Sequence, residues 1–205
     1  MSRGNAPLPP TGWHTIGPFF PRTFFREGDN DLTRLSAGAP PTRRGEPIWL
    51  TGRVLEEGGR PCVNAVLEAW QADAGGRFRH PHDPEHAKAD PDFLGWGRAW
   101  TDADGWYRFR TVMPGGYRDA VGPRAPHVNL AVLASGIMRR LVTTVFFPDF
   151  PEANAADPVL NALPEPGLRA LLVAQPMAAI EGDRAFRFDL LLRGEPEAET
   201  PFFLD

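Results

Sequence analysis

The sequence predicts an all-β protein, namely an antiparallel β-sandwich with long irregular loops and an extended N-terminal arm. Short segments in which apolar and polar residues alternate recur from residue 48 onward, and turn-forming residues separate them. The 205 residues include 21 Gly and 23 Pro, which is too many for a helical bundle. They also include 14 Phe and 6 Trp, which is too many for a disordered chain.

The expected strands are short and follow one another without long helical segments, a spacing typical of a sandwich. They cover residues 48–55, 65–72, 96–100, 106–112, 128–134, 140–147, 169–176 and 185–192. The Asp-Gly pair in TDADG (101–105) indicates a hairpin between two of them. The segment EGD (181–183) indicates another tight turn, between the last two strands. One short helix is expected around Val159–Leu163.

Two units are expected along the chain. Residues 1–45 are rich in Pro, Gly and Arg and show no sustained period, so they predict an extended arm. The arm carries five large aromatic residues, Trp13, Phe19, Phe20, Phe24 and Phe25. We therefore expect it to dock on its own domain or on a partner chain, because exposed apolar surface is unfavourable in water. Residues 46–205 form the sandwich, from which the irregular stretches 73–94 and 113–127 project.

Composition excludes several classes of function. There are 26 acidic and 22 basic residues, giving a formal net charge of −4, which argues against nucleic-acid binding. The single cysteine, Cys62, excludes an internal disulfide and a cysteine-based metal site. The sequence shows no signal peptide and no apolar run near the roughly 20 residues that span a bilayer, so we expect a cytoplasmic protein without membrane contacts.

The first candidate site is the histidine cluster His80, His82 and His86 in RHPHDPEH. Alternate histidines on an extended segment face the same way and could chelate a divalent metal. The simpler interpretation is a solvated polar loop held open by its prolines.

The second candidate combines Tyr117, His127 and Asn129. His127 and Asn129 are two residues apart and share one face of an extended chain. A phenolate and an imidazole that converge from this loop would suit a ferric ion, which favours anionic oxygen ligands. Without further information, a packed tyrosine and a hydrogen-bonded core histidine are the simpler interpretation.

The third candidate is the arm segment TIGPFF (15–20). Gly-Pro preceded by a hydroxyl residue forms a tight corner with a small exposed donor. A plain turn is the alternative, but the apolar residues beside it favour a contact surface.

Several motifs together resemble the intradiol ring-cleaving dioxygenases. They are TIGPFF (15–20), LEAWQADAGGRFRH (67–80), DPDFLGWGRAWTDADGWYRFRTVMPGGY (90–117), APHVNLAVLASGI (125–137) and the tail AFRFDLLLRGE with TPFF. These motifs occur in order over nearly the whole chain. The resemblance implies a β-sandwich fold, in agreement with the strand pattern.

For the catalytic chains of this family, the resemblance implies one non-haem Fe(III) held by two tyrosines and two histidines. In this sequence the second tyrosine position is Tyr117 and the first histidine position is His127. The second histidine position is Asn129, and the first tyrosine position is Glu85. The family's active-site arginine corresponds to Arg124. Because an amide oxygen is a weak neutral ligand, the resemblance implies neither a complete catalytic site nor a bound metal in this chain.

This pattern resembles the family's alpha chains, which bind no iron and pair with a homologous catalytic beta chain. The resemblance places Fe(3+) in that partner, with a catechol-type aromatic acid and O2 at a shared site. It also implies that the arm forms part of the pocket wall, through Thr15, Gly17, Pro18 and Phe19. The position of the alpha chain's substrate-facing arginine is Ser135 here. Arg139 and Arg140 follow, and strand alternation predicts that they point to opposite faces.

Two alternatives remain open at this point. The chain could be a stand-alone metal-dependent dioxygenase that uses Tyr117, His127 and one of Glu85, His86 or His82 as an unusual ligand set. It could instead be a β-sandwich binding module without an enzymatic role, for which an exposed aromatic arm would serve equally well.

Overall fold

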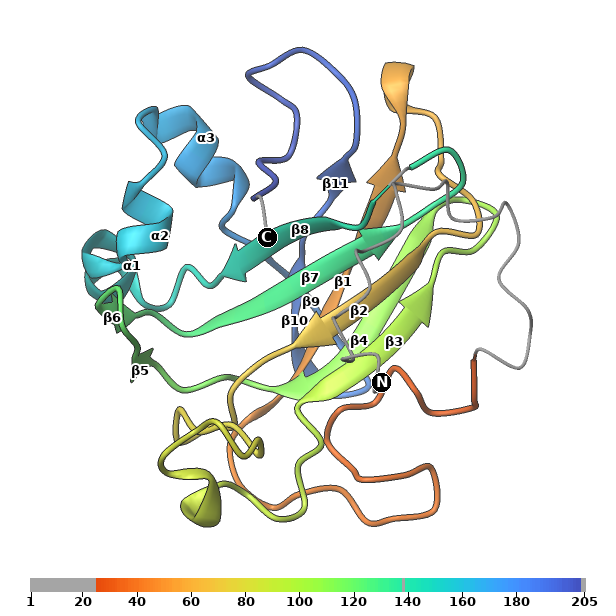
Figure 1. Ribbon diagram of the computed structural model, residues 1–205. Coiled ribbons are helices and arrows are strands. Elements are labelled where there is room, and N and C mark those ends of the chain that lie inside the picture. Colours follow the sequence, from red (N-terminus) through yellow and green to blue (C-terminus); the bar gives the residue numbers. More distant parts are fainter. Residues whose placement is uncertain (1–24, 138, 204–205) are drawn as a thin grey trace, which may run out of the picture.

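Two β-sheets face each other in the computed structural model, which describes residues 25–137 and 139–203 (Figure 1). The five-stranded sheet contains β1 (Pro47–Leu55), β4 (Trp106–Val112), β9 (Gln175–Ile180), β10 (Asp183–Arg187) and β11 (Leu190–Leu191). The four-stranded sheet has the order β3 (Trp96–Trp100), β2 (Val66–Trp70), β7 (His127–Leu133) and β8 (Leu141–Phe146). A third, two-stranded sheet pairs β5 (Tyr117–Arg118) with β6 (Pro123–Arg124). The predicted all-β sandwich is confirmed.

Short helices occupy the connections between strands. They are η2 (Glu57–Gly59), η3 (His86–Lys88), α1 (Pro151–Ala156), α2 (Pro158–Asn161) and α3 (Pro166–Leu171). Helix α2 lies where the sequence predicts a short helix. The predicted strand 169–176 is wrong at its start, because Pro166 at the first helical turn begins α3 and β9 starts only at Gln175. None of the helices among the described residues is long and apolar enough to cross a membrane.

The five-stranded sheet is mixed rather than wholly antiparallel. β4 pairs with one side of β1 in antiparallel orientation, whereas β10 and β11 pair with the other side in parallel orientation. The predicted strand 185–192 is interrupted between β10 and β11, and the interruption lies opposite Gly52 of β1. A Cβ atom at Gly52 would lie 1.8 Å from the carbonyl oxygen of Phe188, so only glycine permits this approach.

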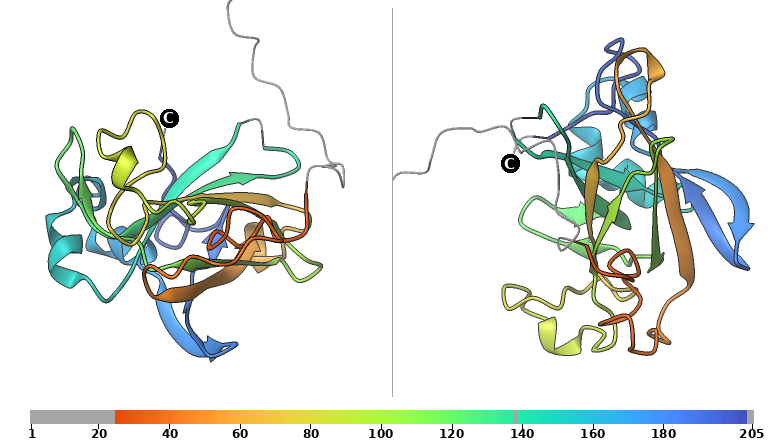
Figure 2. Two further views of the ribbon diagram at one scale, coloured as in Figure 1. Left: turned by 90° about the horizontal axis from the view of Figure 1, so that it is seen from below. Right: turned by 90° about the vertical axis from the view of Figure 1, so that its right-hand side faces the viewer.

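The hairpin predicted at residues 101–105 is wrong. The Asp-Gly turn is present, and the Asp102 carboxylate accepts hydrogen bonds from the amides of Asp104 and Trp106, each at 2.9 Å. However, among the described strands β3 pairs only with β2, and β4 pairs with β1. The turn thus carries the chain from one sheet to the other. The tight turn predicted at 181–183 does form a hairpin: Glu181 and Gly182 have positive φ angles and join β9 to β10, which projects from the sandwich in Figure 2.

The described part of the arm closes one side of the sandwich, where β3 and β4 are edge strands. The amide of Leu32 donates to the Arg110 carbonyl of β4 at 2.8 Å, and the amide of Arg98 in β3 donates to the Asp29 carbonyl at 2.7 Å. Leu32 is fully buried beneath this connection. Phe25 also packs edge-on against Trp100, with ring centroids 4.1 Å apart. These contacts join residues 25–32 to β3 and β4; the docking of the arm as a whole and its boundary at residue 45 stay predictions.

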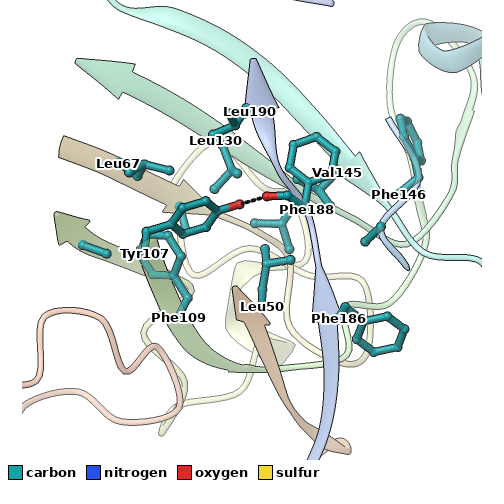
Figure 3. Packing of buried hydrophobic residues seen from close by; sticks show 14 of the residues in the cluster. Leu50, Leu67, Tyr107, Phe109, Leu130, Val145, Phe146, Phe186, Phe188 and Leu190 are labelled. Atoms are coloured by element: carbon teal, nitrogen blue, oxygen red, sulfur yellow. Dashed lines mark hydrogen bonds between the residues drawn. The ribbon is translucent and has the colours of Figure 1, made fainter. Parts of the chain in front are cut away.

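The core between the sheets is built from the alternating apolar residues that the strand pattern identifies (Figure 3). Fully buried members include Leu50, Leu67, Phe109, Leu130 and Phe186. Tyr107 is buried among them, and its hydroxyl donates to the Phe188 carbonyl at 2.6 Å, so the core polar group is satisfied. The sandwich is therefore a rigid support for the loops at its ends.

Candidate functional site

Tyr117, Arg124 and His127 lie together where the chain passes from the small β5–β6 sheet into β7, beside the helices α1 and α2 (Figure 1). Tyr117 and Arg124 are cross-strand partners. His127 opens β7 and is buried. The hydroxyl of Tyr117 lies 3.4 Å from Nε2 of His127. The structure thus brings together two of the positions that the resemblance assigns to metal ligands.

The backbone fixes the orientation of the His127 ring. Its Nδ1 lies 2.6 Å from the carbonyl oxygen of Ala125, which can only accept, so Nδ1 carries the proton and Nε2 faces Tyr117 as an acceptor. The pKa of His127 is lowered from 6.5 to about 4, mainly because the ring is buried. The positive charge of Arg124 contributes to this lowering. Burial also raises the pKa of the Tyr117 phenol, although the positive charge of Arg124 opposes this. Both side chains are therefore neutral near pH 7.

Arg124 is held by two carboxylates. Its Nε lies 3.0 Å from Asp157 and its Nη1 lies 3.1 Å from Asp119. Asp157 is completely buried and also accepts hydrogen bonds from the amides of Ala125, Val159 and Leu160. It therefore joins the loop before β7 to the start of α2. Asp157 is not among the site residues predicted from the sequence, although an aspartate directly before a proline is a typical helix start.

Asn129 lies two residues along β7 from His127, on the same face of the strand. Its Oδ1 accepts a hydrogen bond from the hydroxyl of Thr144 on β8 at 2.9 Å. The amide is thus part of a cross-strand pair between β7 and β8, which are neighbours in the sheet.

Glu85 and the three histidines lie in the irregular loop 73–94. The Glu85 carboxylate pairs with Arg77 at 3.3 Å and with Lys88. His86 Nδ1 lies 2.9 Å from the Asp83 carbonyl, and the rings of His80 and His82 are in contact. Across residues 25–137 and 139–203, no three His, Cys, Asp or Glu side chains are grouped so that they could hold a metal ion.

These residues do not fit the ferric ion that the resemblance implies for catalytic chains. Tyr117 and His127 provide one phenol and one imidazole, and burial disfavours the phenolate form that a ferric ion requires. Asn129 is neutral and already bonded to Thr144, and Glu85 is neutralised by two basic side chains. The guanidinium of Arg124, 5.9 Å from the Tyr117 ring, adds a positive charge beside the position.

The positions assigned to a pocket wall are not part of this group of residues in the described structure. Thr15, Gly17, Pro18 and Phe19 lie outside the described residues. Ser135 is exposed in the turn between β7 and β8, and the length of β7 separates it from His127 by on the order of 25 Å. Arg139 and Arg140 are exposed in the same connection and precede β8, so the strand alternation predicted for them does not apply.

Acidification is expected to destabilise the fold through His127. Its pKa is about 4 in the folded chain and near 6.5 in an unfolded one. Between these values the unfolded state binds more protons, so the free energy of unfolding rises with pH and reaches its full value only above pH 6.5. The loss on going from about pH 6.5 to about pH 4 should approach 3 kcal/mol for this group.

Urea unfolding across this pH window measures the effect. The variant His127→Gln should show a shallower dependence on pH than the parent chain. The variant His82→Gln, at an exposed histidine, should keep the parent's dependence. Identical pH dependence in all three proteins would contradict the role given to burial of His127.

Comparison with known proteins gives consistent results. Residues 16–194 match a family model described as Dioxygenase. The chain is 37% identical over 202 residues to the protocatechuate 3,4-dioxygenase alpha chain of Pseudomonas putida, with 96% of each chain covered. It is 40% identical over 173 residues to the protocatechuate 3,4-dioxygenase beta chain of Burkholderia cepacia, which covers 81% of this chain and 72% of that one.

The fold is also found among solved structures. Catechol 1,2-dioxygenase from Pseudomonas arvilla C-1 matches with a TM-score of 0.56 and 24% sequence identity. The match covers 84% of this chain and 59% of that chain. At this level of identity the similarity concerns the fold.

Proposed function

Because this chain belongs to the intradiol dioxygenase family, we propose that it is a non-catalytic alpha subunit that completes the substrate pocket of a homologous, iron-bearing beta subunit. The complex is an oxidoreductase of the protocatechuate 3,4-dioxygenase type. It cleaves the ring of protocatechuate between the two hydroxylated carbons, incorporates both atoms of O2 and releases 3-carboxy-cis,cis-muconate. Its place of action is the cytoplasm.

One observation carries the proposal: the four positions that resemble the family's ligand sites offer only one phenol and one imidazole. Tyr117 and His127 are 3.4 Å apart, and both are neutral near pH 7. Asn129 and Glu85 are engaged by other side chains of this subunit. Family members generally use ferric iron, which activates a bound catechol toward O2. In the proposed complex this iron belongs to the beta subunit.

Similarity to both kinds of chain supports a partner with the same fold. The alpha relative is matched over 96% of its length, whereas the beta relative is matched over 72%. The contribution of this subunit to the shared pocket comes from the arm, through Thr15, Gly17, Pro18 and Phe19. The alternative of a stand-alone metal enzyme is less well supported, because two of its three candidate third ligands have other partners. Glu85 pairs with Arg77 and Lys88, and His86 Nδ1 lies 2.9 Å from the Asp83 carbonyl.

The test is the iron content of the full-length chain purified alone and together with a beta chain. Alone, the protein should be colourless, free of stoichiometric iron and inactive toward protocatechuate. The co-purified complex should be coloured and should consume O2 with protocatechuate. Tyr117→Phe should leave the iron content of the complex unchanged.

Tyr107→Phe, at the only other tyrosine, is the matched control, because it also removes a phenol hydroxyl and shows the effect of any small loss of stability that follows from this removal. Stoichiometric iron in the lone chain, lost in Tyr117→Phe but not in the control, would overturn the proposal.

A further inference from the structure

A cleft of about 760 Å³ opens between the end of β2, the loop after it and the strand β5. In Figure 1 this loop is the yellow-to-olive segment beside β5. The side chains that matter for its chemistry are Trp70, Phe78, His80, His82, Tyr117 and Arg118. The cleft borders the candidate site described above through Tyr117 and Glu85. The proposed alpha-subunit function, which rests on the arm, does not use its open space.

One wall of the cleft is aromatic. The rings of Trp70 and Phe78 are stacked, with centroids 5.9 Å apart and an interplanar angle of 9°. Tyr117 meets Phe78 edge to face at 5.1 Å, which fixes the Phe78 ring from the other side. Trp70 nevertheless remains 40% exposed, so it presents ring surface on which a planar ligand can stack.

The carboxylates that line the cleft are bound to other groups, and none of them pairs with the guanidinium of Arg118. Three carboxylates line the cleft, Asp83, Glu85 and Asp119, and all are engaged. Asp83 accepts from the amides of Phe78 and Glu85, Glu85 pairs with Arg77 and Lys88, and Asp119 binds Arg124 and the amides of Val121 and Gly122. Arg118, in contrast, is exposed, and its guanidinium has no hydrogen bond or ion pair with any of the described residues. Its guanidinium is available to a carboxylate, which it can bind with two parallel hydrogen bonds.

We propose that this cleft binds a small planar aromatic carboxylate, with the ring on the Trp70–Phe78 wall and the carboxylate on Arg118. The site binds its ligand without reacting with it. All of its lining residues lie between Trp70 and Asp119. Binding therefore requires neither the arm nor the beta partner.

Calorimetric titration of the full-length chain with benzoate tests the proposal. Saturable binding to one site is expected. Benzyl alcohol, which keeps the ring but lacks the charge, should bind at least about tenfold more weakly, because it loses the charge-assisted hydrogen bonds. Acetate, which keeps the charge but lacks the ring, should also bind at least about tenfold more weakly than benzoate.

Substitutions in the cleft test whether benzoate binds there. Arg118→Gln and Trp70→Leu should each weaken benzoate binding by about tenfold or more. Arg193→Gln removes one exposed positive charge outside the cleft and should leave the affinity unchanged. Circular dichroism confirms that each variant is folded. Absence of benzoate binding, or binding that either cleft variant leaves unchanged, would overturn the proposal. Neither result would alter the iron content and turnover on which the alpha-subunit function is tested.

Discussion

Asp157→Ala is expected to lower the free energy of unfolding by about 3–5 kcal/mol, which is the usual effect of removing one partner from a buried ion pair. The Asp157 side chain is completely buried, and that of Arg124 is only 9% exposed. The substitution leaves the guanidinium with Asp119 alone. It also leaves the amides of Ala125, Val159 and Leu160 without their acceptor.

Urea unfolding followed by near-ultraviolet circular dichroism measures this change. Asp102→Ala is the matched control, because Asp102 also accepts two backbone hydrogen bonds but lies in an exposed turn. Its removal should lower stability by about 1 kcal/mol. Similar losses for the two variants would show that Asp157 does not anchor the loop before β7.

Thr15→Ala and Pro18→Ala should raise the KM of the complex for protocatechuate by about tenfold while its iron content stays unchanged. Under the proposed function, these arm residues line the pocket of the beta subunit, so they affect binding of the substrate and not of the metal. Steady-state oxygen uptake and metal analysis on the same preparation separate the two effects.

Thr11→Ala provides the comparison for these arm variants, because it removes a hydroxyl from the arm outside the TIGPFF segment. It should leave KM unchanged. Iron loss in proportion to the change in activity would contradict the pocket-wall role of the arm.

The sequence predicts most strands because their alternation reflects burial on one face. β4 and β7 begin and end within one residue of the expected positions, since their inward side chains alternate with exposed or half-buried ones. The prediction for 169–176 is wrong at its start because a short apolar run does not distinguish a strand from a buried helix. In the structure its start belongs to α3, while Leu172 and Ala174 enter the core between elements.

Pairing between strands was less predictable than the strands themselves. The Asp-Gly turn at 101–105 is a local feature and forms as expected. Which sheet each flanking strand joins depends on partners far away in the sequence, because β3 pairs with β2 and β4 with β1. Local patterns carry no signal for this choice.

In the candidate site as well, local patterns predict some of the residues but not their distant partners. Alternation along an extended chain is enough to predict that His127 and Asn129 share a face, and the loop that leads into their strand suggests Tyr117 beside them. The motif resemblance adds Arg124. The partners that determine their chemistry, Asp157 and Thr144, come from later elements and have no recognisable spacing in the sequence. The neutral state of His127 likewise depends on burial, which a single histidine in a sequence does not reveal.

The parallel pairing of β1 with β10 and β11 has a consequence for biosynthesis. Arg53 of β1 donates its backbone amide to Asp189, 136 residues later. During synthesis on the ribosome, the edge of β1 that pairs with β10 and β11 therefore stays unpaired until nearly the whole polypeptide has emerged. Contacts of such long sequence separation form late and slowly. Premature termination after β8 would therefore leave an aggregation-prone fragment with an open sheet edge.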